Sequence, residues 1–235
     1  MSIAERLRAV EERIAAAAER SGRTRGDITL IAVTKTHPAS MMNEAIEAGA
    51  AYVGENKPQE VRDKFAEVLP VKWHLIGHLQ TNKVKYVIDK CDMIQSVDSV
   101  KLMDEIERLA VSHDTKMDIL IQVNISGEES KSGIEPEQLH ELLKHAGTLT
   151  RVKVRGLMTI IPASNDREEN AGWFRKMKKL YDQTAALAGE YKNVTMEYLS
   201  MGMSGDFETA IECGSNMVRV GSAIFGARNY QIVKG

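Results

Sequence analysis

Residues 28–49 read ITLIAVTKTHPASMMNEAIEAG, and this stretch contains the pattern that decides the fold. A short apolar run rich in β-branched residues leads to Lys35, a break containing Pro38 follows, and a helical pattern then continues to Gly49. The same order of apolar run and helical pattern recurs along the rest of the chain. Apolar runs linked by helices indicate a parallel sheet whose outer face is covered by those helices.

Eight such apolar runs are present, and each except the last is followed by a clear helical pattern. Eight units in about 200 residues favour a (β/α)8 barrel over a doubly wound sheet, which usually has fewer strands. No G-x-G-x-x-G follows the first run, which argues against a dinucleotide-binding fold. The predicted strands are residues 28–35, 51–56, 71–77, 92–98, 117–125, 152–160, 194–202 and 216–226.

An additional amphipathic helix precedes the first strand. Its apolar residues recur at helical spacing, and Gly22 ends it. No linker, fixed-period repeat or low-complexity tract divides the chain, so we expect residues 1–235 to form a single domain. The apolar face of this helix consists of Ile3, Leu7, Val10, Ile14 and Ala17.

The composition excludes several classes of partner. Lys and Arg number 31 against 33 Asp and Glu, so no basic excess points to nucleic acid or to a membrane surface. No apolar run approaches the ~18 residues that a membrane span needs, and glutamates interrupt the first helix, so it is no signal peptide. Cys91 and Cys213 are far apart, without a C-x-x-C motif, and indicate buried thiols of a reducing compartment rather than a disulfide. These features predict a cytoplasmic protein.

Lys35 is unusual because it ends an apolar strand. The simplest interpretation is a lysine whose long side chain reaches water from the strand end. Ile31, Val33 and Lys35 share one face of the strand, however, and if that face is inward the amine lies at the mouth of the barrel. Burial and a nearby cation would both favour the uncharged amine, which is the form that attacks an aldehyde.

Two loops have the composition of an anion site. In a barrel of this type the loops after the seventh and eighth strands commonly bind phosphate, and here they read SMGMSGD (200–206) and VGSAIFG (220–226). Glycines allow backbone amides to approach an anion closely, and the serines add hydroxyl donors, although both residue types also occur in ordinary turns.

Arg219 lies in the last strand, two residues before Gly221 and therefore on the same face. If the Arg219 side chain points outward, it only packs against the surrounding helices. If it points inward, its guanidinium needs a hydrogen-bond partner or a bound group. A lysine, a phosphate site and an arginine at one barrel mouth predict a phosphorylated aldehyde held as a Schiff base, with pyridoxal 5'-phosphate as the first candidate.

The sequence resembles the pyridoxal phosphate homeostasis proteins, which are similar to the N-terminal domain of alanine racemase. The resemblance covers nearly the whole chain and implies a fold-type III barrel. Its motifs are AVTK around Lys35, GEN (54–56), HLIGHLQTNK (74–83), VNISGEESKSG (123–133), GLM (156–158) and LSMGMSGDFETAIECGSNMVRVGSAIFG (199–226).

The resemblance implies roles for individual residues. Lys35 corresponds to the lysine that forms the Schiff base, Arg219 to the arginine facing the pyridine nitrogen, and Asn56 and Met158 to positions around the cofactor. The phosphate site corresponds to Ser200, Gly202, Met203, Ser204, Gly221 and Ser222.

An arginine against the ring nitrogen keeps that nitrogen unprotonated, because two cations cannot share the contact. The ring is then a poor electron sink, and the similar racemases use a second base, a tyrosine from another domain. Tyr198 and Tyr230 are nearby in sequence, but nothing in the sequence directs either hydroxyl to the cofactor. We therefore expect a monomeric carrier that hands pyridoxal phosphate to apoenzymes. The alternatives are an amino-acid racemase on the same cofactor and a Schiff-base aldolase acting on a sugar phosphate.

Three further motifs have simpler interpretations. His74 and His78 lie on a strand and the loop after it, where their spacing does not bring them together, so no metal site is predicted. The stretch EESKSG (128–133) is expected to be a loop near the barrel mouth, and RKMKK (175–179) a solvated helix face without the aromatic residues of a nucleic-acid site.

Overall fold

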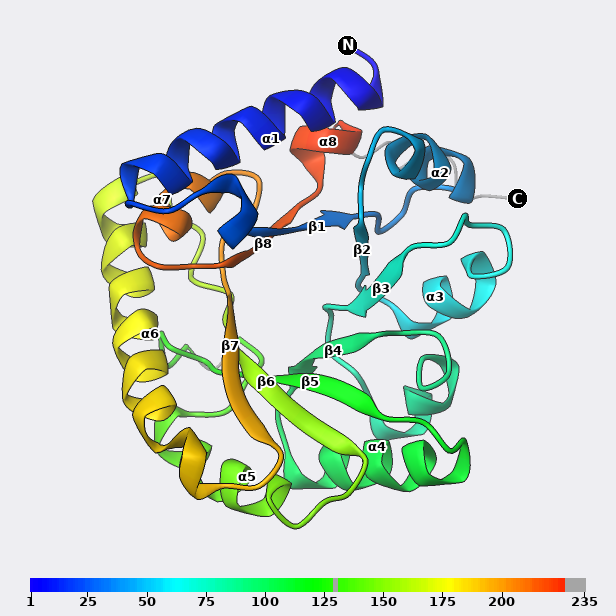
Figure 1. Ribbon diagram of the computed structural model, residues 1–235, viewed down its shortest axis with the longest axis vertical. Coiled ribbons are helices and arrows are strands. Elements are labelled where there is room, and N and C mark those ends of the chain that lie inside the picture. Colours follow the sequence, from blue (N-terminus) through cyan, green and yellow to red (C-terminus); the bar gives the residue numbers. More distant parts are fainter. Residues whose placement is uncertain (129–130, 227–235) are drawn as a thin grey trace.

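The computed structural model describes residues 1–128 and 131–226, which form a closed barrel of eight parallel strands in sequential order (Figure 1). The pairing of β1 with β8 closes the barrel. The predicted (β/α)8 architecture is therefore confirmed. The strands are β1 (Thr29–Val33), β2 (Tyr52–Glu55), β3 (Lys72–Leu75), β4 (Met93–Val97), β5 (Met117–Gln122), β6 (Val152–Met158), β7 (Val194–Ser200) and β8 (Met217–Val220).

Helices cover the outside of this barrel (Figure 1). The α-helices are α1 (Ile3–Arg20), α2 (Ala39–Glu47), α3 (Pro58–Lys64), α4 (Val100–Ser112), α5 (Leu139–Ala146), α6 (Arg167–Leu187), α7 (Phe207–Glu212) and α8 (Ser222–Phe225). Short 3₁₀ helices are η1 (Arg25–Asp27), η2 (Thr81–Tyr86), η3 (Pro136–Gln138) and η4 (Ala188–Glu190).

Two local predictions were wrong. After β3 the chain forms the 3₁₀ helix η2 and no α-helix, since within it only Val84 is buried and one apolar position cannot anchor a longer amphipathic helix. The last strand ends at Val220 and not at residue 226, because Gly221 leaves the ladder and donates its N–H to the Ser204 side chain, after which α8 begins. A short helix therefore follows the eighth strand as well.

The predicted N-terminal helix is confirmed as α1. Ser2 and Glu5 form a capping box at its start, which satisfies backbone donors that the first turn leaves free. Its predicted apolar face is buried and packs against α7, α8 and the outer side of β1 and β8. In Figure 1 this helix, in dark blue, crosses the outside of α7 and α8, so these three helices together cover the seam that closes the barrel.

The interior of the barrel has an apolar lower layer and a polar upper layer. The lower layer contains Ile31, Met93, Leu120, Met158 and Met217, in keeping with the low aromatic content of the chain. Ile31 is fully buried there, so the face of β1 that also carries Val33 is directed inward, as the barrel hypothesis required. The polar layer above it is described with the site.

Two further observations concern the described residues. Cys91 and Cys213 are free thiols; Cys91 is buried as predicted, whereas Cys213, at the end of α7, is only half-buried. No helix in residues 1–128 or 131–226 is both long enough and apolar enough to cross a membrane.

Gly156 in β6 tests the packing between neighbouring strands. Its backbone φ of +149° is one that residues with a side chain rarely adopt. An added Cβ would also lie 1.9 Å from the carbonyl oxygen of Tyr198 in β7. We expect Gly156→Ala to destabilise the fold by about 3 kcal/mol or more, because backbone has to move. Gly172→Ala, in an open position on α6, should instead stabilise by about 0.5–1 kcal/mol. Urea denaturation followed by circular dichroism measures both, and equal effects would contradict this account.

Candidate functional site

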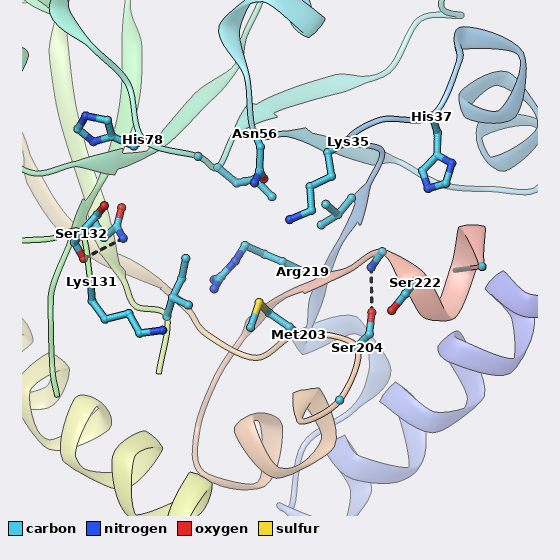
Figure 2. Close-up of a pocket in the computed structure, with 18 residues that line it drawn as sticks. Lys35, His37, Asn56, His78, Lys131, Ser132, Met203, Ser204, Arg219 and Ser222 are labelled. Carbon is cyan, nitrogen blue, oxygen red and sulfur yellow. Dashed lines mark hydrogen bonds between the residues drawn. The ribbon is translucent and has the colours of Figure 1, made fainter. Parts of the chain in front are cut away.

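A cavity of about 500 Å³ opens at the carboxyl ends of the strands, where barrels of this type carry their sites. Residues of the first and last strand–helix units and of intervening loops line it, and Figure 2 shows the Lys35 and Arg219 side chains directed toward one another across it. Seven of the ten residues predicted for a bound cofactor are among the lining residues: Lys35, Asn56, Met203, Ser204, Arg219, Gly221 and Ser222.

The other three predicted residues lie beneath the cavity. Met158 is fully buried in the apolar lower layer, and Ser200 is fully buried with its hydroxyl bonded inside the barrel. Gly202 has a φ of +99° and packs so closely on α7 that a Cβ would lie 2.6 Å from the Ala210 Cβ. The structure therefore places these three as support for the cavity wall rather than on its surface.

Lys35 was predicted to end the first strand, but β1 ends at Val33, so Lys35 lies two residues beyond it on the turn that leads to α2. Its side chain is half-buried and lines the cavity, and Figure 2 shows it directed into the same space as the Arg219 side chain. Val33, on the same face of the chain, lines the cavity as well. Of the two interpretations that the sequence left open, the structure matches the amine at the barrel mouth.

Arg219 projects inward from β8, and only 4% of the residue is exposed. Its guanidinium donates to Ser200 Oγ at 2.6 Å and to the carbonyl oxygen of Thr159 at 2.8 Å. Burial lowers the pKa of Arg219 to about 10, partly offset by the charge of Asp206, so the group is still cationic at neutral pH. The outward orientation that the sequence allowed is thereby ruled out.

A chain of hydrogen bonds fixes Arg219 from below. Ser200 Oγ donates to Gln95 Oε1 at 2.7 Å, and Gln95 Nε2 lies 2.8 Å from His74 Nδ1. An amide nitrogen only donates, so His74 accepts at Nδ1. Burial lowers the pKa of His74 to about 3, so the ring is neutral. The direction of every bond between His74 and the guanidinium is therefore determined.

Ser204 organises the loops after β7 and β8. Its Oγ accepts from the backbone N–H of Gly221 at 3.1 Å and of Ala223 at 3.4 Å, as the dashed line to Gly221 in Figure 2 illustrates. Because its oxygen accepts both bonds, the O–H remains available to donate. Gly221 allows this close packing, since a Cβ there would lie 3.1 Å from the carbonyl oxygen of Val33. The hydroxyls of Ser204 and Ser222 together with two cationic side chains suit an anionic ligand.

The sequence did not identify several residues of the cavity wall. They include Ile76 and Gly77, where Gly77 approaches the Asn56 backbone so closely that a Cβ would lie 2.2 Å from the Asn56 carbonyl oxygen. Lys131 also lines the cavity, within the motif that predicted a loop near the barrel mouth; the placement of residues 129 and 130 lies outside the described ranges. The remaining lining residues not predicted are His37, His78, Gln122 and Ile160, whereas Gly205 and Gly226 belong to the two predicted anion loops and Ser132 to the same motif as Lys131.

The two histidines considered as metal ligands have separate roles. His74 points into the barrel, whereas His78 is exposed and lies 3.4 Å from Asp98. Within residues 1–128 and 131–226, no three or more His, Cys, Asp or Glu side chains come together as a metal site.

A buried charge cluster that the sequence analysis missed lies on the outer side of β1 and β2, behind Lys35. It consists of Glu55, Lys64 and Glu60, with Lys64 Nζ 2.9 Å from Glu55 Oε1 and 2.7 Å from Glu60 Oε2. Glu55 is fully buried, and its Oε2 has no hydrogen-bond partner in the described structure. We refer to these three residues as the Glu55 cluster. Its signal in the sequence was a carboxylate in an apolar strand, the same kind of anomaly as Lys35.

Several known proteins are similar to this chain in sequence and in fold. The profile of the alanine racemase N-terminal domain family matches residues 6–229. A protein of Aquifex aeolicus named pyridoxal phosphate homeostasis protein is 45% identical over 232 residues, which cover 98% of this chain and 100% of that one. The structure of PipY from Synechococcus elongatus PCC7942 with pyridoxal phosphate bound superimposes with a TM-score of 0.82 at 32% identity, covering 96% of this chain and 100% of that chain.

Alanine racemase of Clostridium difficile shares the fold with a TM-score of 0.73, at 17% identity, covering 97% of this chain and 61% of the racemase chain. The barrel is thus of the class found in the N-terminal domain of alanine racemases. With relatives of this identity along nearly its whole length, the chain belongs to the family of pyridoxal phosphate homeostasis proteins.

The hydrogen-bond chain below Arg219 gives a stability prediction. Gln95→Leu removes the partners of His74 Nδ1 and Ser200 Oγ at once. We expect a loss of about 2–4 kcal/mol in the free energy of unfolding, because buried polar groups lose their partners. Gln183→Leu, on the exposed face of α6, should change stability by less than about 0.5 kcal/mol. Urea denaturation measures both, and a neutral Gln95→Leu would contradict the described bonding.

Glu55 gives a prediction on pH. Burial, together with the charge of Glu60, raises its pKa to about 7, although Lys64 lowers it. A carboxyl with a raised pKa binds its proton more tightly in the folded state than in the unfolded state, so stability falls as pH rises through this range. We expect Glu55→Gln to gain about 3 kcal/mol in unfolding free energy relative to the unchanged protein between pH 4 and pH 8.

The matched control is Glu137→Gln, an exposed carboxylate in η3. Because this side chain is exposed, the substitution should change the free energy of unfolding by less than about 0.5 kcal/mol. Chemical denaturation at a series of pH values makes the comparison, and a Glu55→Gln difference independent of pH would show that Glu55 is not the titrating group.

Proposed function

We propose that this chain binds pyridoxal 5'-phosphate, holds it as a Schiff base on Lys35 and acts in the cytoplasm, as a monomer, to store it and pass it to apoenzymes. The observation that supports this most directly is the cavity in which Lys35 and Arg219 lie together with the hydroxyls of Ser204 and Ser222. The name of the Aquifex aeolicus relative and the bound pyridoxal phosphate in PipY point in the same direction.

The donor set fits such a compound group by group. When bound, pyridoxal phosphate supplies an aldehyde carbon, to which an amine adds with loss of water. Lys35 is an amine directed into the cavity, within reach of a ligand bound there. Ser204 and Ser222 would bind the phosphate through their hydroxyls, since the backbone N–H groups of Gly221 and Ala223 hold the Ser204 oxygen in place and leave its O–H to donate.

Arg219 favours storage over catalysis. Its buried guanidinium is held by neutral oxygens, so it brings a full positive charge to the cavity wall. Facing the pyridine nitrogen, it would oppose protonation of that nitrogen and so weaken the ring as an electron sink. Chemistry that depends on electron withdrawal by the ring is thereby restrained, whereas reversible Schiff-base formation is unaffected.

A racemase is the second candidate, and the likeness to alanine racemase at 17% identity concerns the fold alone. Of the two tyrosines considered as a second base, Tyr198 packs on the apolar lower layer of the barrel and is not among the residues lining the cavity. Tyr230 lies outside the described residues. The storage role therefore has more support from the site.

The test is an absorbance titration with pyridoxal phosphate, followed by borohydride reduction and peptide mass mapping. We expect an absorbance band of a Schiff base, an adduct on Lys35, and loss of the band in Lys35→Ala. Lys131→Ala is the matched control, because Lys131 is another lysine of the same cavity and should leave the band in place.

A colourless protein in the presence of excess pyridoxal phosphate, or an adduct on Lys131, would overturn the proposal. Incubation of the loaded protein with D- and L-alanine separates the two candidates. Interconversion that disappears in Lys35→Ala would establish a racemase, and its absence together with transfer to an apoenzyme would establish a carrier.

A further inference from the structure

The Glu55 cluster lies directly behind the turn that carries Lys35. Glu55 ends β2 and Lys64 ends α3, which covers the barrel beside β2 and β3 in Figure 1. Lys64 is only 15% exposed at its side chain, Glu60 19% and Glu55 not at all. The cluster is thus a nearly dry arrangement of two carboxylates around one ammonium group.

One end of the cluster holds the residue before Lys35. Thr34 Oγ1 donates to Glu55 Oε1 at 2.7 Å, and Lys64 Nζ lies 3.4 Å from the carbonyl oxygen of Thr34. Thr34 is fully buried, so water does not compete for these bonds. Both the side chain and the backbone of Thr34 are therefore tied to the cluster.

The other end holds the residue after Lys35. The backbone N–H of Thr36 donates to Glu60 Oε2 at 2.8 Å. Thr36 has a φ of +67°, and a β-branched residue in the left-handed region is strained. A charged acceptor at its N–H offsets that strain and keeps the turn in one conformation. The cluster is consequently bonded to the backbone on both sides of Lys35.

Stability alone does not account for such a cluster. Removing a buried ion pair from water commonly costs as much free energy as the attraction between the two charges returns. A protein with apolar side chains of similar shape in their place is often at least as stable. Here the cost is larger, because Glu55 Oε2 is buried without a hydrogen-bond partner in the described structure. What the charges provide that apolar side chains could not is a set of directed bonds to Thr34 and Thr36.

We propose that Glu55, Lys64 and Glu60 are positioning residues for Lys35, which fix the turn of residues 34–36 so that the amine is held in the cavity in a reactive orientation. The inference rests on the proposed function, in which Lys35 is the residue that reacts. None of the three lines the cavity, so they act through the backbone and not by contact with the ligand.

The test compares the rate of Schiff-base formation with affinity for a ligand that cannot form one. Glu60→Ala removes the acceptor of the Thr36 N–H, whereas Glu60→Gln keeps an acceptor oxygen. We expect Glu60→Ala to slow appearance of the absorbance band about tenfold, since small misplacements of a reacting group cost at least this much. Glu60→Gln should be closer to the unchanged protein. Affinity for pyridoxine 5'-phosphate, which has an alcohol in place of the aldehyde, should be the same in all of them.

Asp63→Asn is the matched control, because Asp63 lies on the same helix and makes only an exposed pair with Arg62. Its rate should equal that of the unchanged protein. An unaltered rate in Glu60→Ala, or an equal loss of affinity for pyridoxine 5'-phosphate, would overturn the inference, the latter because the cluster would then support the cavity in general. Failure of the unchanged protein itself to form the band would instead overturn the proposed function.

Discussion

The pairing of β1 with β8 is the contact on which the site depends. In its register Ile31 lies opposite Arg219 and Ala32 opposite Val220, so the first and last strands are held side by side. This closure brings Lys35, from the first strand–helix unit, into the same cavity as Arg219, from the last. The helix α1 packs across the outside of this seam, together with α7 and α8. Its apolar face therefore stabilises the junction that assembles the site as well as the fold.

Much of this arrangement could be predicted from the sequence, because it follows from periodicity and from polar residues in unexpected places. Apolar runs alternating with helical patterns are sufficient to predict a barrel, and a barrel in turn specifies which strand ends share a cavity. Lys35 and Arg219 were found because Arg219 is a cation within an apolar run and Lys35 is a cation at the end of one. The length of the last strand was not predictable in this way. It depends on Gly221 donating its N–H to Ser204, a contact between two loops that no local pattern contains.

The partners of buried polar groups were also beyond prediction. Glu55 and Gln95 both stand in apolar strands, but successive side chains of a strand point to opposite faces, so one residue of register decides which face a side chain occupies. Gln95 turns inward to His74 and Ser200. Glu55 turns outward, toward a lysine of the next helix. Only the three-dimensional register distinguishes a residue beneath the cavity from one behind it.

Lys64 and Arg219 are the two buried cations considered in this region, and they have different roles: Lys64 supports the turn beside the cavity, whereas Arg219 can act on a bound ligand. Lys64 lies between the carboxylates of Glu55 and Glu60, which neutralise its charge. It therefore affects the site only by holding the neighbouring turn in place. Arg219 donates to a hydroxyl and a carbonyl oxygen, and in the described part of the chain no carboxylate forms an ion pair with it. Neutral acceptors fix a guanidinium without cancelling its charge. The positive potential therefore remains in the cavity, where an anionic ligand can use it, while the neutralised cluster outside the barrel keeps the facing turn in place.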